Sequence, residues 1–140
     1  MRTSVDSSVL LCILRRQPGR EKWRTTLTQA AEEGSLVLCP VVFAECSPGF
    51  AHSKEALAKF VSLGLIYDAF SSECAYLAGQ MFLRYLRERG PRRYLIPDFL
   101  IAAHACTQAN RLAAVDRGSA HTSPICSFSL HLQPHEKTHR

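Results

Sequence analysis

The stretch Tyr94-Leu95-Ile96-Pro97-Asp98-Phe99-Leu100-Ile101-Ala102-Ala103-His104-Ala105 is the part of the sequence around which the rest is organised. Pro97 fits just before a helix or at its first position, and Asp98 follows where a carboxylate can accept hydrogen bonds from free N–H groups. The apolar run behind them, with its small alanines, predicts a compact helix that packs closely on a sheet. Taken alone, Asp98 is most simply a helix cap.

The bulk composition indicates one ordinary globular domain. The chain has 140 residues, of which 46% are hydrophobic and 21% charged, and this length is enough to bury a core. The net charge of +5 suits a polyanionic partner such as RNA, although many proteins without such a partner carry a similar charge. No apolar run reaches about 18 residues, so no membrane span is expected. Asp6 stands too early for a signal peptide, so we expect a cytoplasmic protein.

Six cysteines raise the question of disulfides or zinc. They are Cys12, Cys39, Cys46, Cys74, Cys106 and Cys126. None of them forms a CxxC pair, and most lie among apolar residues. We therefore expect buried free thiols in a reducing compartment rather than disulfides or a zinc site.

The order of predicted elements indicates an α/β fold. Strands are expected at 3–5, 36–39, 65–67 and 111–115, and helices at 7–16, 21–33, from Pro40, at 53–63, 71–89 and from Pro97. This alternation predicts a three-layer α/β/α sandwich with a mostly parallel sheet of four or five strands and right-handed crossovers.

The sequence changes character after residue 118. Residues 1–118 read as the folded domain, and residues 119–132 as an atypical C-terminal segment rich in Ser and His. Within that segment, residues 127–132 alternate polar and apolar side chains and predict a possible edge strand. Residues 133–140 read as a disordered basic tail rather than a metal site, although their histidines have i, i+4 spacing.

Four acids occupy comparable junctions between the predicted elements. Asp6 and Asp116 fall at strand ends, and Glu45 and Asp98 are expected in the first turns of helices. In a parallel sheet such junctions lie at one edge, where four unpaired carboxylates would repel each other. A hard divalent cation, Mg²⁺ or Mn²⁺, removes that conflict and suits carboxylate ligands better than zinc does. Each acid also has a structural interpretation, as a helix cap or a partly exposed helix acid.

A second group of charged residues follows the helix predicted at 71–89. It contains Arg84, Arg87, Arg89, Arg92 and Arg93. Arginine matches phosphate geometry well, so this group is the best candidate for RNA binding, and we add Arg117 to it. A solvated helix end is the alternative. No aromatic residues are interleaved for base stacking, so any contacts are expected to be to phosphates.

Four stretches, taken together, resemble a known family. They are Val5-Asp6-Ser7-Ser8-Val9-Leu10-Leu11, Val41-Val42-Phe43-Ala44-Glu45, Ile96-Pro97-Asp98-Phe99-Leu100-Ile101-Ala102-Ala103-His104-Ala105 and Val115-Asp116-Arg117-Gly118. In this order they resemble the PIN-domain ribonucleases, most closely the VapC-type toxins of bacterial toxin–antitoxin pairs. The resemblance spans about residues 2–118, and the third stretch is the most specific.

The resemblance implies a metal-dependent endoribonuclease with a PIN-like fold. Asp6 and Asp98 would be the principal ligands of Mg²⁺ or Mn²⁺, and Glu45 and Asp116 would hold a second ion or the attacking water. Ser8 would be a supporting hydroxyl. The resemblance also implies an RNA substrate, an antitoxin protein that covers the site, and a homodimer.

Two departures from the family pattern leave an alternative open. Ala114 stands where the family often has Ser or Thr, and residues 119–124 do not look like the usual aromatic-rich turn and closing strand. The alternative is a catalytically weak or inactive PIN-like domain that mainly binds an antitoxin or nucleic acid. A phospho-aspartate phosphatase is disfavoured because Asp6 does not begin a DxD motif. The absence of GxGxxG and P-loop motifs disfavours a nucleotide-binding domain.

Overall fold

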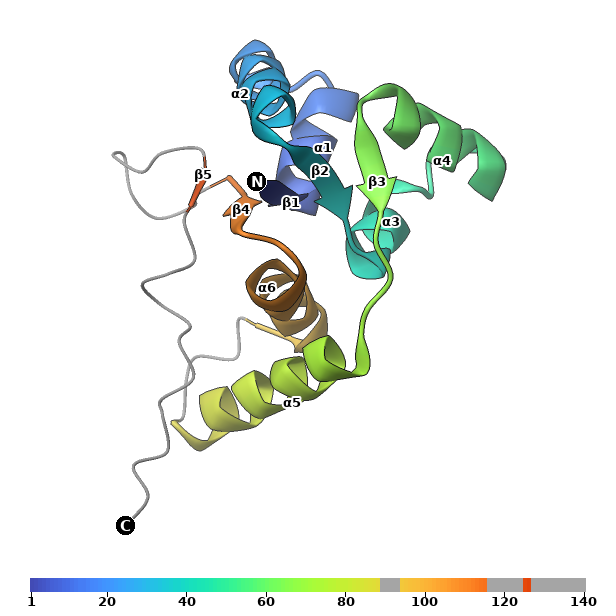
Figure 1. Cartoon of the computed structure of the whole chain (residues 1–140). Coiled ribbons are helices and arrows are strands. Elements are labelled where there is room, and N and C mark those ends of the chain that lie inside the picture. Colours follow the sequence, from blue (N-terminus) through green and yellow to red (C-terminus); the bar gives the residue numbers. More distant parts are fainter. Residues whose placement is uncertain (89–93, 116–124, 127–140) are drawn as a thin grey trace.

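The computed structural model describes residues 1–88, 94–115 and 125–126. Its elements in chain order are β1 (Arg2–Val5), α1 (Ser7–Leu14), α2 (Arg20–Glu33), β2 (Ser35–Leu38), α3 (Pro40–Cys46), α4 (Ser53–Ser62), β3 (Leu65–Tyr67), α5 (Ser72–Arg87), α6 (Ile96–Gln108), β4 (Arg111–Ala113) and β5 (Ile125–Cys126). Strands and helices alternate along the chain, as the sequence predicts (Figure 1).

The strands form one sheet in the order β3-β2-β1-β4-β5. The first four strands are parallel, and β5 runs antiparallel to β4. Strand β1 lies at the centre, where Ser4 pairs with Val37 of β2 on one side and Leu112 of β4 on the other. The predicted mostly parallel sheet is therefore confirmed.

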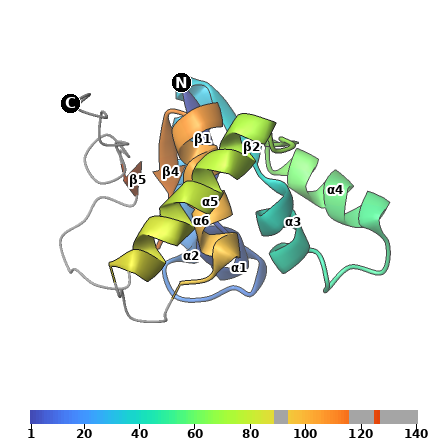
Figure 2. The same cartoon turned by 90° about the horizontal axis from the view of Figure 1, so that it is seen from below.

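Helices cover both faces of this sheet. Helix α6 packs directly on β1 and β4, and α5 packs on α6. Helices α1 and α2 lie on the opposite side, and α4 lies beside the edge strand β3 (Figures 1 and 2). This arrangement is the predicted three-layer sandwich, and it brings the carboxyl end of β1 and the start of α6 to the same edge of the sheet.

The core consists of apolar strands and small helical residues. The central strands are buried on both faces, which explains their continuous apolar sequences: Val5, Leu36, Val37 and Leu38 are almost completely inaccessible. Ala103 and Ala105 of α6 are also buried. Ala105 belongs to the same apolar cluster as the strands, so its small side chain lets the helix approach the sheet closely, whereas Ala103 packs with Cys74 and Ala78 of α5.

The prediction of free thiols is confirmed for the five cysteines whose side chains the structure describes, and the side chain of Cys126 lies outside the described residues. Cys12, Cys39, Cys46 and Cys74 are buried and free, and Cys106 is half-buried and free.

Three expectations about element boundaries need correction. Helix α3 starts at Pro40, as predicted, but it has only seven residues, so Glu45 lies in its last turn rather than its first. Helix α1 ends at Leu14 rather than near residue 16, because Arg16 adopts the left-handed conformation, with φ of 51°. Strand β4 ends at Ala113, two residues earlier than predicted.

The structure describes only two residues of the segment beyond residue 118, so it tests only part of the C-terminal predictions. Strand β5 falls inside the segment 119–132, where an edge strand was expected. The predicted strand at 127–132 and the predicted tail at 133–140 lie outside the described residues. Within the described ranges, no helix combines the length and apolar character needed to cross a bilayer.

Candidate active site

Asp6 stands where β1 passes into α1. Its N–H donates to the Ala113 carbonyl (2.9 Å), which continues the β1–β4 pairing, and its side chain caps α1. Asp6 Oδ2 accepts hydrogen bonds from the Ser8 N–H (3.3 Å) and the Ser8 hydroxyl (2.5 Å). The Ser8 hydroxyl oxygen also accepts from the Val115 N–H (3.1 Å). Ser8 therefore orients the Asp6 carboxylate and connects it to the chain that leads to Asp116.

Asp98 is the third residue of α6, since the helix begins at Ile96 with Pro97 second. Its Oδ2 accepts a hydrogen bond from the Leu95 N–H (2.8 Å), so the carboxylate does cap the helix start. The residue is nevertheless exposed. Capping fixes the orientation of the side chain without enclosing it.

Glu45 reaches the same edge of the sheet from α3. Burial raises the pKa of its carboxyl, the negative charges of Asp6 and Asp98 raise it further, and a hydrogen bond from Ser7 opposes the rise. Because Glu45 is exposed, water screens this repulsion. Asp6 and Asp98 are thus near enough for their charges to act on Glu45, although the three acids lie on three different elements.

The donor set fits a hard divalent cation bound through few protein ligands. No group of three or more His, Cys, Asp or Glu side chains in the described ranges is placed so as to enclose a metal. Mg²⁺, however, is usually held by one or two carboxylates and several waters. Asp6 and Asp98 each use Oδ2 for their hydrogen bonds to described residues, and Oδ1 remains available. A cation bound by these carboxylates would offset their repulsion with Glu45.

Part of the predicted site lies outside the described residues. This holds for Asp116 and for the candidate RNA-binding residues Arg89, Arg92, Arg93 and Arg117. Arg84 and Arg87 lie in the last turn of α5, where they are exposed. The Arg84 guanidinium makes an exposed ion pair with Glu88 (2.9 Å), which reduces its net positive charge.

Aromatic rings lie at the junction of α5 and α6, next in sequence to Arg84. Tyr85 follows Arg84 on α5, and its ring packs edge-to-face against Tyr94 (centroids 5.8 Å apart) and at a tilt against Phe99 (5.4 Å). This packing joins α5 to the start of α6, and the expectation that no aromatic residues are interleaved for base stacking stays a prediction. Tyr94 is half-exposed, four residues before Asp98.

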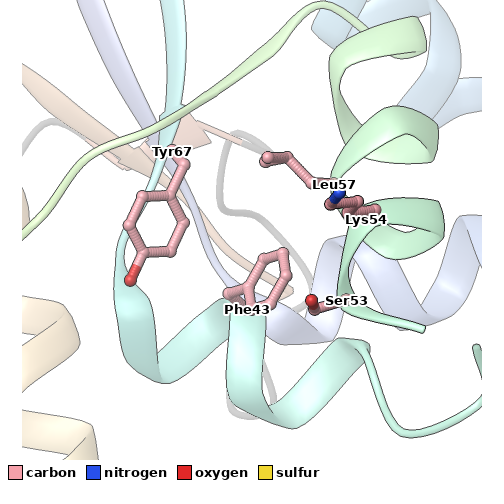
Figure 3. A pocket seen from close by; sticks show the side chains of 5 residues that line it. All are labelled: Phe43, Ser53, Lys54, Leu57 and Tyr67. Atoms are coloured by element: carbon pink, nitrogen blue, oxygen red, sulfur yellow. The ribbon is translucent and has the colours of Figure 1, made fainter.

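A separate groove lies between α3, α4 and β3. Its volume is about 220 Å³, and it is lined by Phe43, Ser53, Lys54, Leu57 and Tyr67 (Figure 3). Phe43 and Glu45 are two residues apart on α3, so they project from different sides of the helix. The groove is mostly apolar, because Phe43, Leu57 and Tyr67 form much of its lining. It is distinct from the surface that carries Glu45.

Two solved structures are similar to the chain in fold. One belongs to the crystal structure of VapBC2 from Rickettsia felis bound to a DNA fragment from their promoter, with 20% identity, a TM-score of 0.62, and coverage of 78% of this chain and 84% of that one. The other is Mycobacterium tuberculosis VapC20, described as a sarcin-ricin loop cleaving toxin, with 14% identity, a TM-score of 0.61, and coverage of 83% and 91%.

The comparison with curated proteins found no match. In the comparison with family models, the PIN domain model matches residues 4–122, which is most of the chain. This match agrees with the α/β sandwich and spans the four sequence stretches. The chain belongs to the PIN domain family.

Proposed function

We propose that this protein is a Mg²⁺- or Mn²⁺-dependent endoribonuclease and the toxin of a toxin–antitoxin pair. The observation that carries the proposal is the convergence of Asp6, Glu45 and Asp98, whose charges are coupled at one edge of a PIN fold. The description of VapC20 as a toxin that cleaves the sarcin-ricin loop supports RNA as the substrate.

In this proposal Asp6 and Asp98 hold the cation, with Asp116 and Glu45 beside them. A bound Mg²⁺ or Mn²⁺ supplies activation of water and neutralisation of phosphate charge. Ser8 keeps Asp6 in one orientation, and the Leu95 N–H does the same for Asp98. Glu45 Oε, whose pKa is raised, is suited to accept the proton of the attacking water.

The RNA would be held by cations and aromatic rings near the start of α6. We propose phosphate contacts for Arg84, Arg87, Arg92, Arg93 and Arg117. Tyr94 adds an exposed ring four residues from Asp98, where a base can stack. Arg15 belongs to the same region, since its charge acts on Cys46 beside Glu45.

The proposal includes an antitoxin partner, a homodimer and a cytoplasmic location. The VapBC2 name of one similar structure supports the antitoxin. A partner is also consistent with the apolar groove and with the exposed Ile66 and Tyr67 on the edge strand β3, since association would bury these side chains.

The test is cleavage of a mixed RNA substrate by purified protein with Mn²⁺ or Mg²⁺. We expect cutting that EDTA abolishes and that falls by at least about 100-fold in Asp98→Asn, as for loss of a major electrostatic group. Glu73→Gln is the matched control, because Glu73 is an exposed acid in the first turn of α5, away from the site. This control should cut like the wild type.

The opposite result favours the second candidate, a PIN domain that acts by binding. Folded wild-type protein that leaves every RNA intact, with either metal, would contradict the nuclease proposal. The departures at Ala114 and beyond residue 118 are the specific reason to keep this alternative.

A further inference from the structure

A buried polar network outside the candidate site joins α6 to the sheet. The His104 side chain on α6 is completely buried. Its Nδ1 lies 3.1 Å from the Ser4 hydroxyl on β1, and its Nε2 lies 2.8 Å from Asp68 Oδ2, just after β3. Asp68 Oδ2 also accepts from Gln108 Nε2 (3.0 Å) and pairs with Arg2 (3.2 Å). We call Arg2, Ser4, Asp68, His104 and Gln108 the His104 network.

The hydrogen-bond partners of His104 determine which ring nitrogen carries the hydrogen. A carboxylate only accepts hydrogen bonds, so Nε2 carries the hydrogen and donates to Asp68. In the neutral ring, Nδ1 is then the acceptor, and the Ser4 hydroxyl donates to it. Burial lowers the pKa of His104, and this effect outweighs the hydrogen bond and negative charge of Asp68, which raise the pKa. The ring is therefore mainly neutral at neutral pH.

Stability alone does not account for such a network in this position. Ser4 is fully buried on the central strand, where the neighbouring Val5, Val37 and Leu38 are apolar. A buried hydroxyl and a buried imidazole cost free energy unless they are hydrogen-bonded, and an apolar pair would fill the same space at no such cost. The directional bonds instead select one arrangement of the two elements.

Apolar packing also joins α6 to the sheet, since Ile101 and Ala105 belong to the apolar cluster that contains the strands. Directional hydrogen bonds constrain the position of the helix along the strand more sharply than such apolar contacts do. A second anchor lies at the carboxyl end of α6, where the Gln108 carbonyl accepts from Arg2 Nε (2.9 Å) and the Gln108 amide donates to the Ala69 carbonyl (2.8 Å). Two anchors along one helix fix its direction as well as its position.

Both anchored elements carry a candidate metal ligand. Ser4 is two residues before Asp6, about 7 Å along the strand. His104 is six residues after Asp98, about 9 Å along the helix. Because both elements are rigid over these distances, a shift of α6 along β1 would move Asp98 relative to Asp6 by the same amount.

We propose that the His104 network is a positioning device: it holds α6 at one place along β1 and thereby sets the separation of the Asp6 and Asp98 carboxylates. The inference rests on the proposed function, since it assigns these carboxylates to a cation. His104 and Ser4 are positioning residues here and do not touch the substrate.

The test is calorimetric titration of Mn²⁺ into RNA-free protein. The variants are Ser4→Ala, which removes one hydroxyl, and His104→Leu, which removes both ring contacts. Thr107→Val is the matched control, because Thr107 is also on α6 but its hydroxyl donates to Ala103 of the same helix (2.8 Å). We expect the Mn²⁺ dissociation constant to rise by at least about fivefold in both variants, and to stay within about twofold in the control.

A conservative variant separates positioning from general loss of stability. His104→Asn places an acceptor near the position of Nδ1, so it keeps the hydrogen bond from the Ser4 hydroxyl and loses the hydrogen bond to Asp68. We expect its Mn²⁺ affinity to lie closer to that of the wild type than the affinity of His104→Leu, even where the two variants unfold at similar temperatures.

The outcomes distinguish this inference from the proposed function. If folded Ser4→Ala and His104→Leu bind Mn²⁺ as the wild type does and only unfold at a lower temperature, the positioning role is overturned. The nuclease proposal is not affected by that result. Wild-type protein that binds Mn²⁺ but cuts no RNA would overturn the nuclease, while the ranking of affinities would still support positioning. A wild type that binds no Mn²⁺ would overturn both.

Discussion

Glu45 is the residue at which the three described acids of the site interact. Its carboxyl lies near Asp6 and Asp98, and their charges together with burial raise its pKa. A raised pKa means that the folded chain disfavours the ionised carboxyl. Its contribution to the free energy of unfolding therefore falls as pH rises from 4.5, the ordinary pKa, through the raised pKa of the folded state.

Replacing Glu45 by Gln should consequently stabilise the metal-free protein. We expect the unfolding temperature near neutral pH to rise by about 1–3 °C, a small effect because solvent screens the repulsion. Differential scanning calorimetry with EDTA measures it. At pH values below the ordinary pKa the difference should vanish, and a persistent or reversed difference would contradict the electrostatic explanation.

Cys46, the next residue, should be chemically inert in the folded protein. Burial first, and then the charges of Glu45 and Asp6, raise the pKa of its thiol to about 12. At about pH 8 almost none of it is the reactive thiolate. Mass spectrometry after iodoacetamide treatment should find Cys46 unmodified in native protein and modified in urea. Rapid alkylation of the native protein would show that the thiol is accessible or ionised.

The turn between α2 and β2 shows how one position can constrain two elements. Gly34 has an extended backbone that any residue adopts, with φ of 163°. The restriction is one of space, because a Cβ at Gly34 would overlap the backbone carbonyl of Met1. That carbonyl accepts the Ser35 N–H (2.9 Å), so α2 and β2 are joined tightly to the chain start that leads into β1.

Gly34→Ala should therefore destabilise the protein by about 1–3 kcal/mol, as overpacking does elsewhere. Gly79→Ala is the matched control: Gly79 lies exposed on α5 with no atom within 4 Å of an added Cβ. It should stabilise the protein by about 0.5–1 kcal/mol, because alanine favours the helix. Urea denaturation of both variants measures the difference, and equal effects would refute the steric argument.

At the scale of the whole molecule, the buried His104 links stability to pH. Its pKa is lowered in the fold, from an ordinary value of 6.5, because burial disfavours the charged ring. The stability associated with the neutral ring is fully present above 6.5. As pH falls below that value, the unfolded chain takes up the proton first, and stability is lost until the folded pKa is passed.

His104→Gln should weaken this acid sensitivity, since the amide keeps a donor for Asp68 but does not titrate. Between about pH 7.5 and about pH 5.5, we expect the free energy of unfolding to fall less steeply in the variant than in the wild type. Urea denaturation at a series of pH values gives both slopes. Parallel slopes would mean that His104 does not titrate differently in the two states.

The predictability of the candidate site differs between its parts. Asp6 and Asp98 could be predicted because each marks the start of a helix: Asp6 follows a short apolar strand, and Asp98 follows Pro97. The position of Glu45 near them follows from the same logic, although its place in the last turn of α3 does not, since the end of a short helix has no sharp signal. His104, Ser4 and Asp68 could not be grouped in advance: they lie on three separate elements, and a lone histidine in an apolar helix indicates no partner.

The sequence predicted the α/β class, the order of the elements through β4, the family and three acids that lie near one another in the fold. It could do so because helix starts, buried parallel strands and glycine breaks are governed by neighbouring residues and by the period of the side chains. The folded structure was needed to show which residues far apart in sequence meet. The Ser4–His104 contact, the Tyr85–Tyr94 packing and the coupling of Glu45 to Asp6 and Asp98 depend on how α6 and α3 lie on the sheet. Such contacts follow from directional hydrogen bonds and close packing, which local sequence does not encode.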